Sequence, residues 1–258
     1  MIIKVISLQK SIYRRQYIHK ELSKLDLIYE FENAVKINSW SDAKLKIGSK
    51  KNFQLRYNRF PKLGEIGCSI SHNLVRKKFV EKNNKQTLMV LEDDAKIVCT
   101  KSELFSVIKF FKKSKFDILI LGYSKCDDDY EKHLNIINPI LPIYKTNKIL
   151  IGPRYLCTTS GTVGYVIKKK SAKKMLKIFS ESILADDWDF FSKSGLKIAH
   201  TSPMLIRENY QNLVSTLNRN NYSLKFKNSK NFIINFLLKL RKFSIGLLRR
   251  ILLKFRYF

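Results

Sequence analysis

The stretch Thr87–Asp94, TLMVLEDD, joins a compact apolar run directly to three carboxylates. Its first five residues are typical of a strand buried within a sheet. Carboxylates at the end of such a strand cost free energy unless a cation meets them. The stretch therefore predicts a central strand with functional carboxylates at its end.

Glu92, Asp93 and Asp94 allow two interpretations. A hard divalent ion takes oxygen ligands, and such an ion also bridges a diphosphate and neutralises a leaving group. Alternatively, the three carboxylates form a solvated turn or favour the N-terminus of a helix. The triplet alone does not separate a metal site from these structural roles.

Short apolar runs alternate with helical patterns on both sides of the triplet. This alternation predicts an α/β fold with a mostly parallel central sheet, in which ligands bind beyond the carboxyl ends of strands. We expect strands at Ile2–Leu8, Tyr29–Phe31, Thr87–Leu91, Asp117–Leu121, Thr162–Ile167 and Lys197–His200, and helices at Ile12–Leu25, Leu63–Lys82, Glu103–Lys113 and Ser171–Ser180. Residues 38–60 and 122–154 are expected to be loops.

Composition limits the classes of protein. The 258 residues include 50 Lys and Arg against 21 Asp and Glu, a net charge of +29, which favours a polyanionic partner such as nucleic acid, an anionic membrane or a phosphorylated substrate. The chain is 45% hydrophobic, so disorder of the body is excluded. Its four cysteines are widely spaced without a CxxC pair or a Cys/His cluster, which predicts neither a zinc site nor a disulfide framework and fits a cytosolic location.

The C-terminal residues have a different composition. No Asp or Glu follows Glu208, and within Asn231–Phe258 basic residues line one helical face while Leu, Ile and Phe fill most of the other. This pattern predicts a basic amphipathic helix that lies in a membrane interface. The alternative is a core helix packed on the domain. No run of about 18 uncharged apolar residues occurs, so no transmembrane span is predicted.

Two further clusters carry polar groups. Gly64–His72, GEIGCSISH, offers Glu65, Ser69 and His72 near one helix start, either to line a site or to cap and pack the helix. Cysteine–histidine catalysis lacks an identifiable orienting group there. Asp186–Asp189, DDWD, supplies either a general base or the N-cap of a short helix.

Taken in order, these pieces resemble the bacterial lipooligosaccharide glycosyltransferases of family 25, which include β-1,4-galactosyltransferases. The resemblance spans about residues 1–206. The matching segments are Val5–Leu8 followed by Arg14 and Arg15, Gly64–His72, Val90–Ala95, Gly161–Ile167 with Ala172, and Asp186–Trp188. The chain departs from the family pattern at Ser7 and Gly164, which bears on the choice of donor sugar.

The resemblance implies a GT-A-type fold, a UDP-sugar donor, Mn²⁺ or Mg²⁺, and inversion at the anomeric carbon. It implies that Asp94, Asp93 and Glu92 hold the metal against the diphosphate, with His200 as a further ligand. Further implied positions are Ser7, Leu8 and Arg14 at the uridine end, Arg15 on phosphate, Glu65 at the site wall, and Asp187 as the base.

The resemblance therefore implies a hexosyltransferase, with UDP-galactose as donor and a lipid-linked lipooligosaccharide core as acceptor. We expect a transferase domain at 1–206, a linker at 207–230 and a membrane-association helix at 231–258. That helix would place a cytoplasmic enzyme peripherally on the inner membrane, whose anionic surface attracts basic residues. The alternatives are a basic nucleic-acid-binding protein, for which no motif is present, and an inactive transferase fold that serves as a membrane scaffold.

Overall fold

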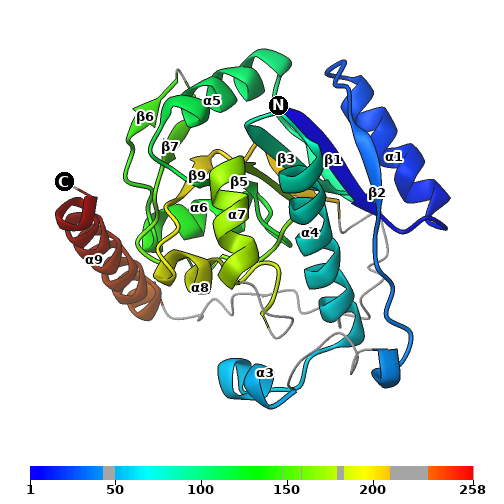
Figure 1. The fold of residues 1–258 in the computed structure, drawn as a ribbon. Coiled ribbons are helices and arrows are strands. Elements are labelled where there is room, and N and C mark those ends of the chain that lie inside the picture. Colours follow the sequence, from blue (N-terminus) through cyan, green and yellow to red (C-terminus); the bar gives the residue numbers. More distant parts are fainter. Residues whose placement is uncertain (43–49, 147, 158, 179–182, 210–231, 258) are drawn as a thin grey trace.

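The computed structural model describes residues 1–42, 50–146, 148–157, 159–178, 183–209 and 232–257 (Figure 1). Its centre is an eight-stranded sheet in the order β2-β1-β3-β8-β5-β9-β7-β6. The strands are β1 (Ile2–Ser7), β2 (Glu30–Asn33), β3 (Thr87–Glu92), β5 (Ile118–Gly122), β6 (Tyr144–Lys145), β7 (Leu150–Gly152), β8 (Gly164–Lys168) and β9 (Ile198–Ser202). A second sheet pairs β4 (Ala95–Ile97) with β10 (Ile206–Glu208).

The pairings confirm the expected α/β class and the mostly parallel sheet. β1 is parallel to both β2 and β3, and β5 is parallel to β9. β8 lies antiparallel between β3 and β5, and β7 is antiparallel to β9 and β6. Six of the eight strands therefore share one direction, and the carboxyl ends of β1, β2 and β3 lie at the same edge.

Helices cover both faces of this sheet. Apolar residues of α1 and α5 pack with Met89 and Leu91 on one face, and those of α4, α7 and α8 pack with Leu88 and Val90 on the other. This alternation along β3 follows from the two-residue period of a strand. The helices are α1 (Ile12–Ser23), α3 (Lys50–Tyr57), α4 (Leu63–Lys82), α5 (Lys101–Lys113), α6 (Asp128–Ile137), α7 (Lys169–Ile178), α8 (Trp188–Lys193) and α9 (Phe232–Tyr257).

Two of the expected loops contain regular structure. α3 forms within residues 38–60, and α6, β6 and β7 form within residues 122–154. Three consecutive aspartates, at 127–129 within the second expected loop, begin α6. Asp127 caps this helix by accepting a hydrogen bond from Tyr130 N at 2.8 Å. Those carboxylates favour a helix N-terminus, so the loop prediction was wrong for a local physical reason.

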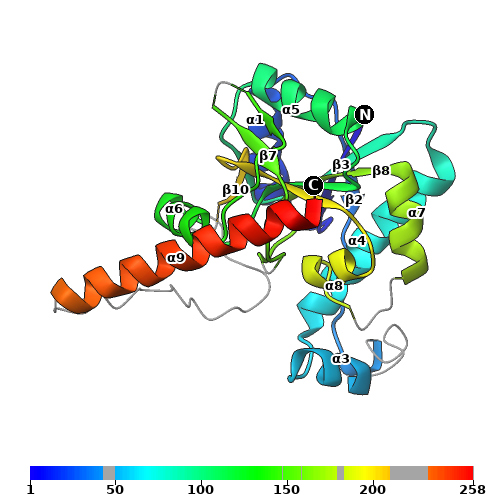
Figure 2. The same ribbon diagram turned by 90° about the vertical axis from the view of Figure 1, so that its left-hand side faces the viewer.

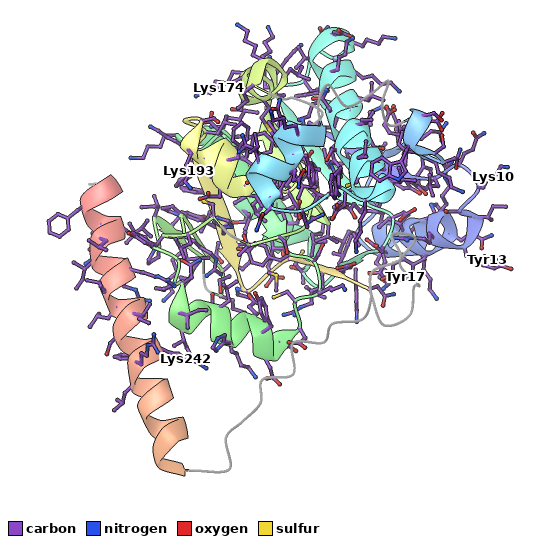
Figure 3. The ribbon with its side chains drawn as sticks, turned by 90° about the horizontal axis from the view of Figure 1, so that it is seen from below. Lys10, Tyr13, Tyr17, Lys174, Lys193 and Lys242 are labelled. Atoms are coloured by element: carbon purple, nitrogen blue, oxygen red, sulfur yellow. The ribbon has the colours of Figure 1, made fainter. Side chains whose placement is uncertain are left out.

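The C-terminal helix α9 lies against α6 at the outside of the molecule (Figures 1 and 2). Gly246 is buried at this contact, and a Cβ there would lie 1.9 Å from Ile136 O. Arg249 Nη1 donates to Ile137 O at 2.7 Å, and Leu253 is fully buried. Gly246, Arg249 and Leu253 thus face the domain, and Lys242 also lies on the α6 side in Figure 3.

The predicted linker at 207–230 begins within β10, and its residues 210–230 lie outside the described part of the chain. Among the helices of the described residues, none combines the length and apolar character needed to cross a bilayer.

Candidate active site

The acidic triplet lies where β1 and β3 end side by side. Ile6 pairs with Glu92 in the parallel register, which puts Ser7 next to Asp93. Ser7 Oγ donates to Asp93 Oδ2 at 2.7 Å. The side chains of Asp93 and Asp94 are buried, so the carboxylates meet partners within the protein rather than bulk water.

Arg14 supplies a positive charge at this edge. It lies in the first turn of α1, and its Nε is 2.7 Å from Asp93 Oδ1 while its Nη2 donates to Asp94 Oδ2. Ser7 and Arg14 were both expected near the nucleotide, and the structure brings them to the same pair of aspartates. Asp94 Oδ1 is buried and has no hydrogen-bond partner among the described residues.

The electrostatics at Asp94 leave an excess of negative charge. Burial, followed by the charge of Glu92, raises the pKa of Asp94 to about 8, and Arg14 opposes both. Glu208 and Asp93 also raise the pKa of Asp94. Carboxylates that disfavour one another in a buried site are stabilised by a cation, so this donor set fits a divalent ion with oxygen ligands.

Arg15 lies beside this site and contacts residues of β1 and β2. It donates to Asn33 Oδ1 at 2.6 Å and to Ser7 O at 3.3 Å, and its guanidinium lies 4.6 Å from the ring centroid of Phe31. These contacts join the ends of β1 and β2. Leu8 follows β1 directly and is half-buried. Both residues therefore lie at the expected edge of the sheet.

Glu92 is directed toward α4 rather than toward Arg14. Thr162 Oγ1 donates to Glu92 Oε1, and His72 Nε2 lies 3.4 Å from the same oxygen. Cys68 Sγ is 3.9 Å from Thr162 Oγ1. Sequence reasoning missed Thr162, whose position before β8 gave no chemical signal.

Glu65 holds the start of α4. Its Oε2 accepts from Lys62 N at 2.9 Å, and Arg59 donates to both carboxylate oxygens at 2.8 Å and 2.9 Å. These are the contacts of a helix-capping carboxylate. Ser69 is buried on the same helix. The hydrogen bond from Lys62 N fits the capping alternative for Glu65.

Hydrogen bonds of Gly161 and Thr162 link the second acidic cluster, Asp186–Asp189, to the acidic triplet. Asp186 Oδ2 accepts from Gly161 N at 2.7 Å, and Trp188 Nε1 donates to Gly161 O at 3.1 Å. Gly161 has φ of +106°, and a Cβ there would lie 2.2 Å from Ser124 Oγ. Only glycine allows this close turn, which places Thr162 on Glu92.

Asp187 caps α8 and contacts α3. Its Oδ1 accepts from Phe190 N at 3.0 Å, and its Oδ2 accepts from Tyr57 OH at 2.7 Å. Burial is the largest cause that raises the pKa of Tyr57, so its hydroxyl stays protonated and donates. Sequence reasoning missed Tyr57 because α3 was expected to be a loop.

His200 lies away from the triplet. It is fully buried on β9, three strands from β3 in the sheet order, which is roughly 14 Å at the usual strand spacing. Its Nδ1 is 2.8 Å from Tyr123 OH, and burial followed by the charge of Arg154 holds its pKa well below the ordinary value. The structure does not bring His200 to Asp94, so we leave it out of the metal set.

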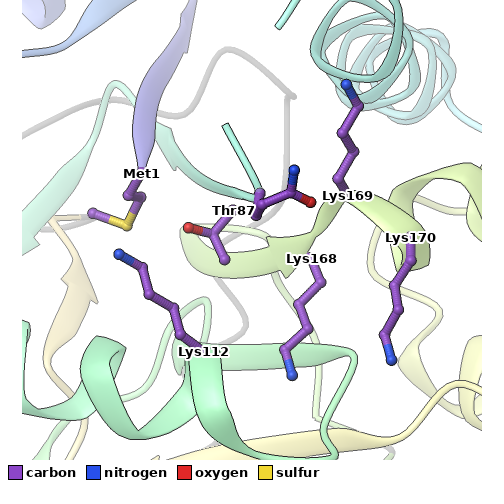
Figure 4. A pocket seen from close by; sticks show the side chains of 7 residues that line it. Met1, Thr87, Lys112, Lys168, Lys169 and Lys170 are labelled. Carbon is purple, nitrogen blue, oxygen red and sulfur yellow. The ribbon is translucent and has the colours of Figure 1, made fainter. Parts of the chain in front are cut away.

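A pocket of ≈ 310 Å³ lies at the other end of β3, around Thr87. Figure 4 shows that its lysine side chains diverge: Lys112 points toward Met1, whereas Lys168 and Lys170 point away from it. Because β3 separates this pocket from Glu92, it is not part of the candidate site.

Comparison with known proteins identifies the family of the chain. The sequence profile of glycosyltransferase family 25 (LPS biosynthesis protein) matches residues 1–189. A "Glycosyltransferase 25 family member" of Aedes aegypti is 29% identical over 179 residues, which cover 67% of this chain and 27% of that protein. A "Putative glycosyltransferase" of Haemophilus influenzae is 25% identical over 209 residues, which cover 77% of this chain and 67% of that protein.

Solved structures are more distant. S. aureus TarS 1–349 in complex with UDP has a TM-score of 0.45 at 12% identity, with 80% of this chain and 60% of that chain covered. A197 from STIV has a TM-score of 0.43 at 15% identity, with 77% and 80% covered. Both scores lie below 0.5. The profile match over residues 1–189 is the decisive comparison, and the chain belongs to glycosyltransferase family 25.

Proposed function

We propose that the protein is an inverting, metal-dependent hexosyltransferase that moves galactose from UDP-galactose onto a lipooligosaccharide core. Family membership supports the transferase class. The observation that carries the proposal is the pair Asp93 and Asp94 at the shared edge of β1 and β3, with the buried Asp94 Oδ1 lacking a partner among the described residues.

The metal would bind at Asp93 and Asp94. A bound Mn²⁺ or Mg²⁺ would neutralise the diphosphate that departs from the sugar. Glu92 contributes its charge from the side, since it raises the pKa of Asp94. Arg14 orients both aspartates through its two contacts, and its remaining N–H groups suit a phosphate oxygen.

The donor would lie across the ends of β1 and β2. Ser7 and Leu8 form the wall at the end of β1, and Arg15 holds the neighbouring strand through Asn33. The phosphates would then point toward Arg14 and the aspartates. Glu65, at the start of α4, would act indirectly by holding Arg59. The charge of Arg59 interacts electrostatically with that of Asp186.

Asp187 is the proposed base that removes the proton of the acceptor hydroxyl. Each of its oxygens accepts one hydrogen bond, from Phe190 N and Tyr57 OH, which fixes the orientation of the carboxylate. A carboxylate oxygen has a second lone pair, so both contacts leave room for a proton from the acceptor. Asp186, the preceding residue, is a competing carboxylate, and it accepts a hydrogen bond from Gly161 N.

The acceptor would be lipid-linked, and α9 would hold the protein at an anionic membrane surface on the cytoplasmic side. The side of α9 opposite Gly246 carries apolar residues that are 41% to 83% exposed. They are Leu240, Phe243, Leu247, Leu248, Ile251, Leu252 and Phe255. Arg241, Arg250 and Lys254 are exposed among them, and no acidic residue follows Glu208 to neutralise them. Apolar and basic groups together favour an anionic interface.

A donor assay tests the enzymatic proposal. Purified full-length protein is given UDP-galactose, Mn²⁺ and a truncated lipooligosaccharide, and UDP release is measured. We expect turnover that requires all three components and is lost in Asp94→Asn. Absence of UDP release with every UDP-hexose tested would overturn the proposed function and favour an inactive scaffold.

A further inference from the structure

Cys68 and His72 face Glu92 beside the candidate active site. The two residues are four apart on α4, so they lie on the same helical face one turn from each other. Glu92 meets them from the end of β3. The potential ligand atoms of the three residues all lie within 4.8 Å of one another. The spacing of Cys68 and His72 is visible in the sequence, but no metal site was predicted there because the third member comes from another element.

His72 presents one ring nitrogen to this cluster. The ring is fully buried, and its Nδ1 lies 3.1 Å from Tyr165 OH, to which Arg76 Nη1 also donates at 3.3 Å. With the proton on Nδ1, the ring donates to the tyrosine oxygen and leaves the Nε2 lone pair directed at Glu92. A hydrogen bond from the distal nitrogen orients a ligating imidazole in this way. Burial lowers the pKa of His72, which keeps the ring neutral and able to ligate.

The surrounding charges suit a dication. Glu92 and Asp186 are negative and Arg76 is positive, and all three act electrostatically on His72. If Cys68 binds as a thiolate, it adds a third negative charge to those of Glu92 and Asp186, against the single positive charge of Arg76. A divalent ion brings this total to zero, which removes the free-energy cost of an unbalanced buried cluster.

We propose that Cys68, His72 and Glu92 form a binding site for a thiophilic divalent cation, represented by Zn²⁺. Thiolate, imidazole and carboxylate are the donors that zinc prefers, whereas Mn²⁺ and Mg²⁺ favour oxygen. Cys68 is half-buried, which leaves a fourth position for water. Bond lengths of about 2.0–2.3 Å require the three side chains to close inward by a small rotation. Bound zinc would join α4 to the end of β3.

Metal titration of the full-length protein tests this site. Protein freed of metal by a chelator is titrated with Zn²⁺ against a chromophoric chelator, and Co²⁺ is used in parallel because a cobalt–thiolate bond absorbs in the near ultraviolet. We expect one equivalent of Zn²⁺ and a thiolate band with Co²⁺. Cys68→Ser and His72→Gln should each weaken Zn²⁺ binding by on the order of tenfold or more, and the Co²⁺ band should vanish in Cys68→Ser.

Two variants serve as matched controls. Cys99→Ser removes another half-buried thiol outside the cluster, and Asp94→Asn alters the aspartate site. Both should keep stoichiometric Zn²⁺ and the Co²⁺ band. Zn²⁺ should also raise the Tm of the wild type and of Cys99→Ser but not of Cys68→Ser, while the unliganded variants keep similar Tm values.

The proposal is overturned if the wild type takes up no stoichiometric Zn²⁺, or if Cys68→Ser binds Zn²⁺ as tightly as the wild type. These outcomes are independent of the transferase proposal. If the protein releases no UDP but binds Zn²⁺, the transferase proposal fails and the zinc site stands. If the protein releases UDP but binds no Zn²⁺, only the zinc site fails.

Discussion

Arg14 Nε lies 2.7 Å from Asp93 Oδ1, so the first turn of α1 is tied to the end of β3 by a largely buried ion pair. The same guanidinium contacts Asp94. Because the pair is shielded from water, removal of Arg14 leaves the carboxylates of Asp93 and Asp94 without their counter-charge. Arg14 therefore contributes to folding as well as to the proposed nucleotide site.

Arg14→Gln should lower the free energy of unfolding by about 3 kcal/mol in the absence of metal, because it leaves two buried aspartates unpaired. Urea denaturation in the presence of a chelator measures this. Arg15→Gln is the control, since its side-chain partner Asn33 is neutral, and its loss should stay below about 1.5 kcal/mol. Equal losses for both variants would contradict the role of the ion pair.

The stability of the metal-free protein should fall as pH rises. Burial, followed by the charge of Glu92, raises the pKa of Asp94 to about 8, whereas the ordinary value is 3.8. Between these two values the folded protein retains a proton that the unfolded chain has released. Stability therefore decreases through this window and levels off above about pH 8.

Asp94→Asn should remove this decrease, because the amide does not titrate. Urea unfolding of both proteins at about pH 5 and about pH 9, with chelator present, measures the slope of the free energy of unfolding against pH. The exposed Asp127→Asn should keep the wild-type slope. A wild-type slope in Asp94→Asn would show that another group causes the pH dependence.

Asp187→Asn should reduce kcat by about 10²–10⁴-fold with little change in KM for the UDP-sugar, as expected for loss of a general base. Asparagine also caps helices, so α8 and the Tm should be preserved. Steady-state kinetics of UDP release measure the effect. Asp127→Asn, the same change at the N-cap of α6, is the matched control and should keep full activity. A larger loss of kcat in Asp186→Asn than in Asp187→Asn would transfer the role of base to Asp186.

Leu247→Ser combined with Leu248→Ser should abolish sedimentation of the protein with anionic vesicles, because both side chains lie on the exposed apolar side of α9. Arg250→Gln should weaken binding about fivefold, which corresponds to about 1 kcal/mol per basic residue. Phe105→Ser on α5 is the control, since this exposed aromatic lies on a different helix. Unchanged sedimentation of the double variant would exclude α9 as the membrane contact.

Gly246→Val should separate α9 from α6, because any Cβ at this position meets Ile136 O at 1.9 Å. We expect faster amide hydrogen exchange in α9 and α6, with UDP release from the donor in the presence of a soluble acceptor unchanged. Ser244→Val places the same side chain on the exposed side of the helix and should leave exchange unaltered. Identical exchange in both variants would contradict the observed contact.

Local sequence pattern predicted the elements that are strongly apolar or strongly periodic. β3 and α4 follow the runs at Thr87–Leu91 and Leu63–Lys82 almost residue for residue. The position of Ser7, Arg14 and the acidic triplet at one edge also follows from the sequence, because parallel strands end at the same side of a sheet. α3 escaped prediction because its residues show no apolar period, whereas α6 escaped because its acidic start was interpreted as part of a surface loop.

The sequence by itself determined the α/β class, the family and the carboxylates at the end of β3, since each depends on a contiguous stretch of chain. Tertiary structure alone decided which distant groups meet: Glu92 turns to Cys68 and His72, Tyr57 reaches Asp187, and His200 is buried three strands away. It also decided that α9 packs through Gly246, Arg249 and Leu253 and leaves Leu240, Leu247, Leu248 and Leu252 exposed. A helical pattern defines two faces, but only the shape and hydrogen-bond acceptors of α6 select the face that docks.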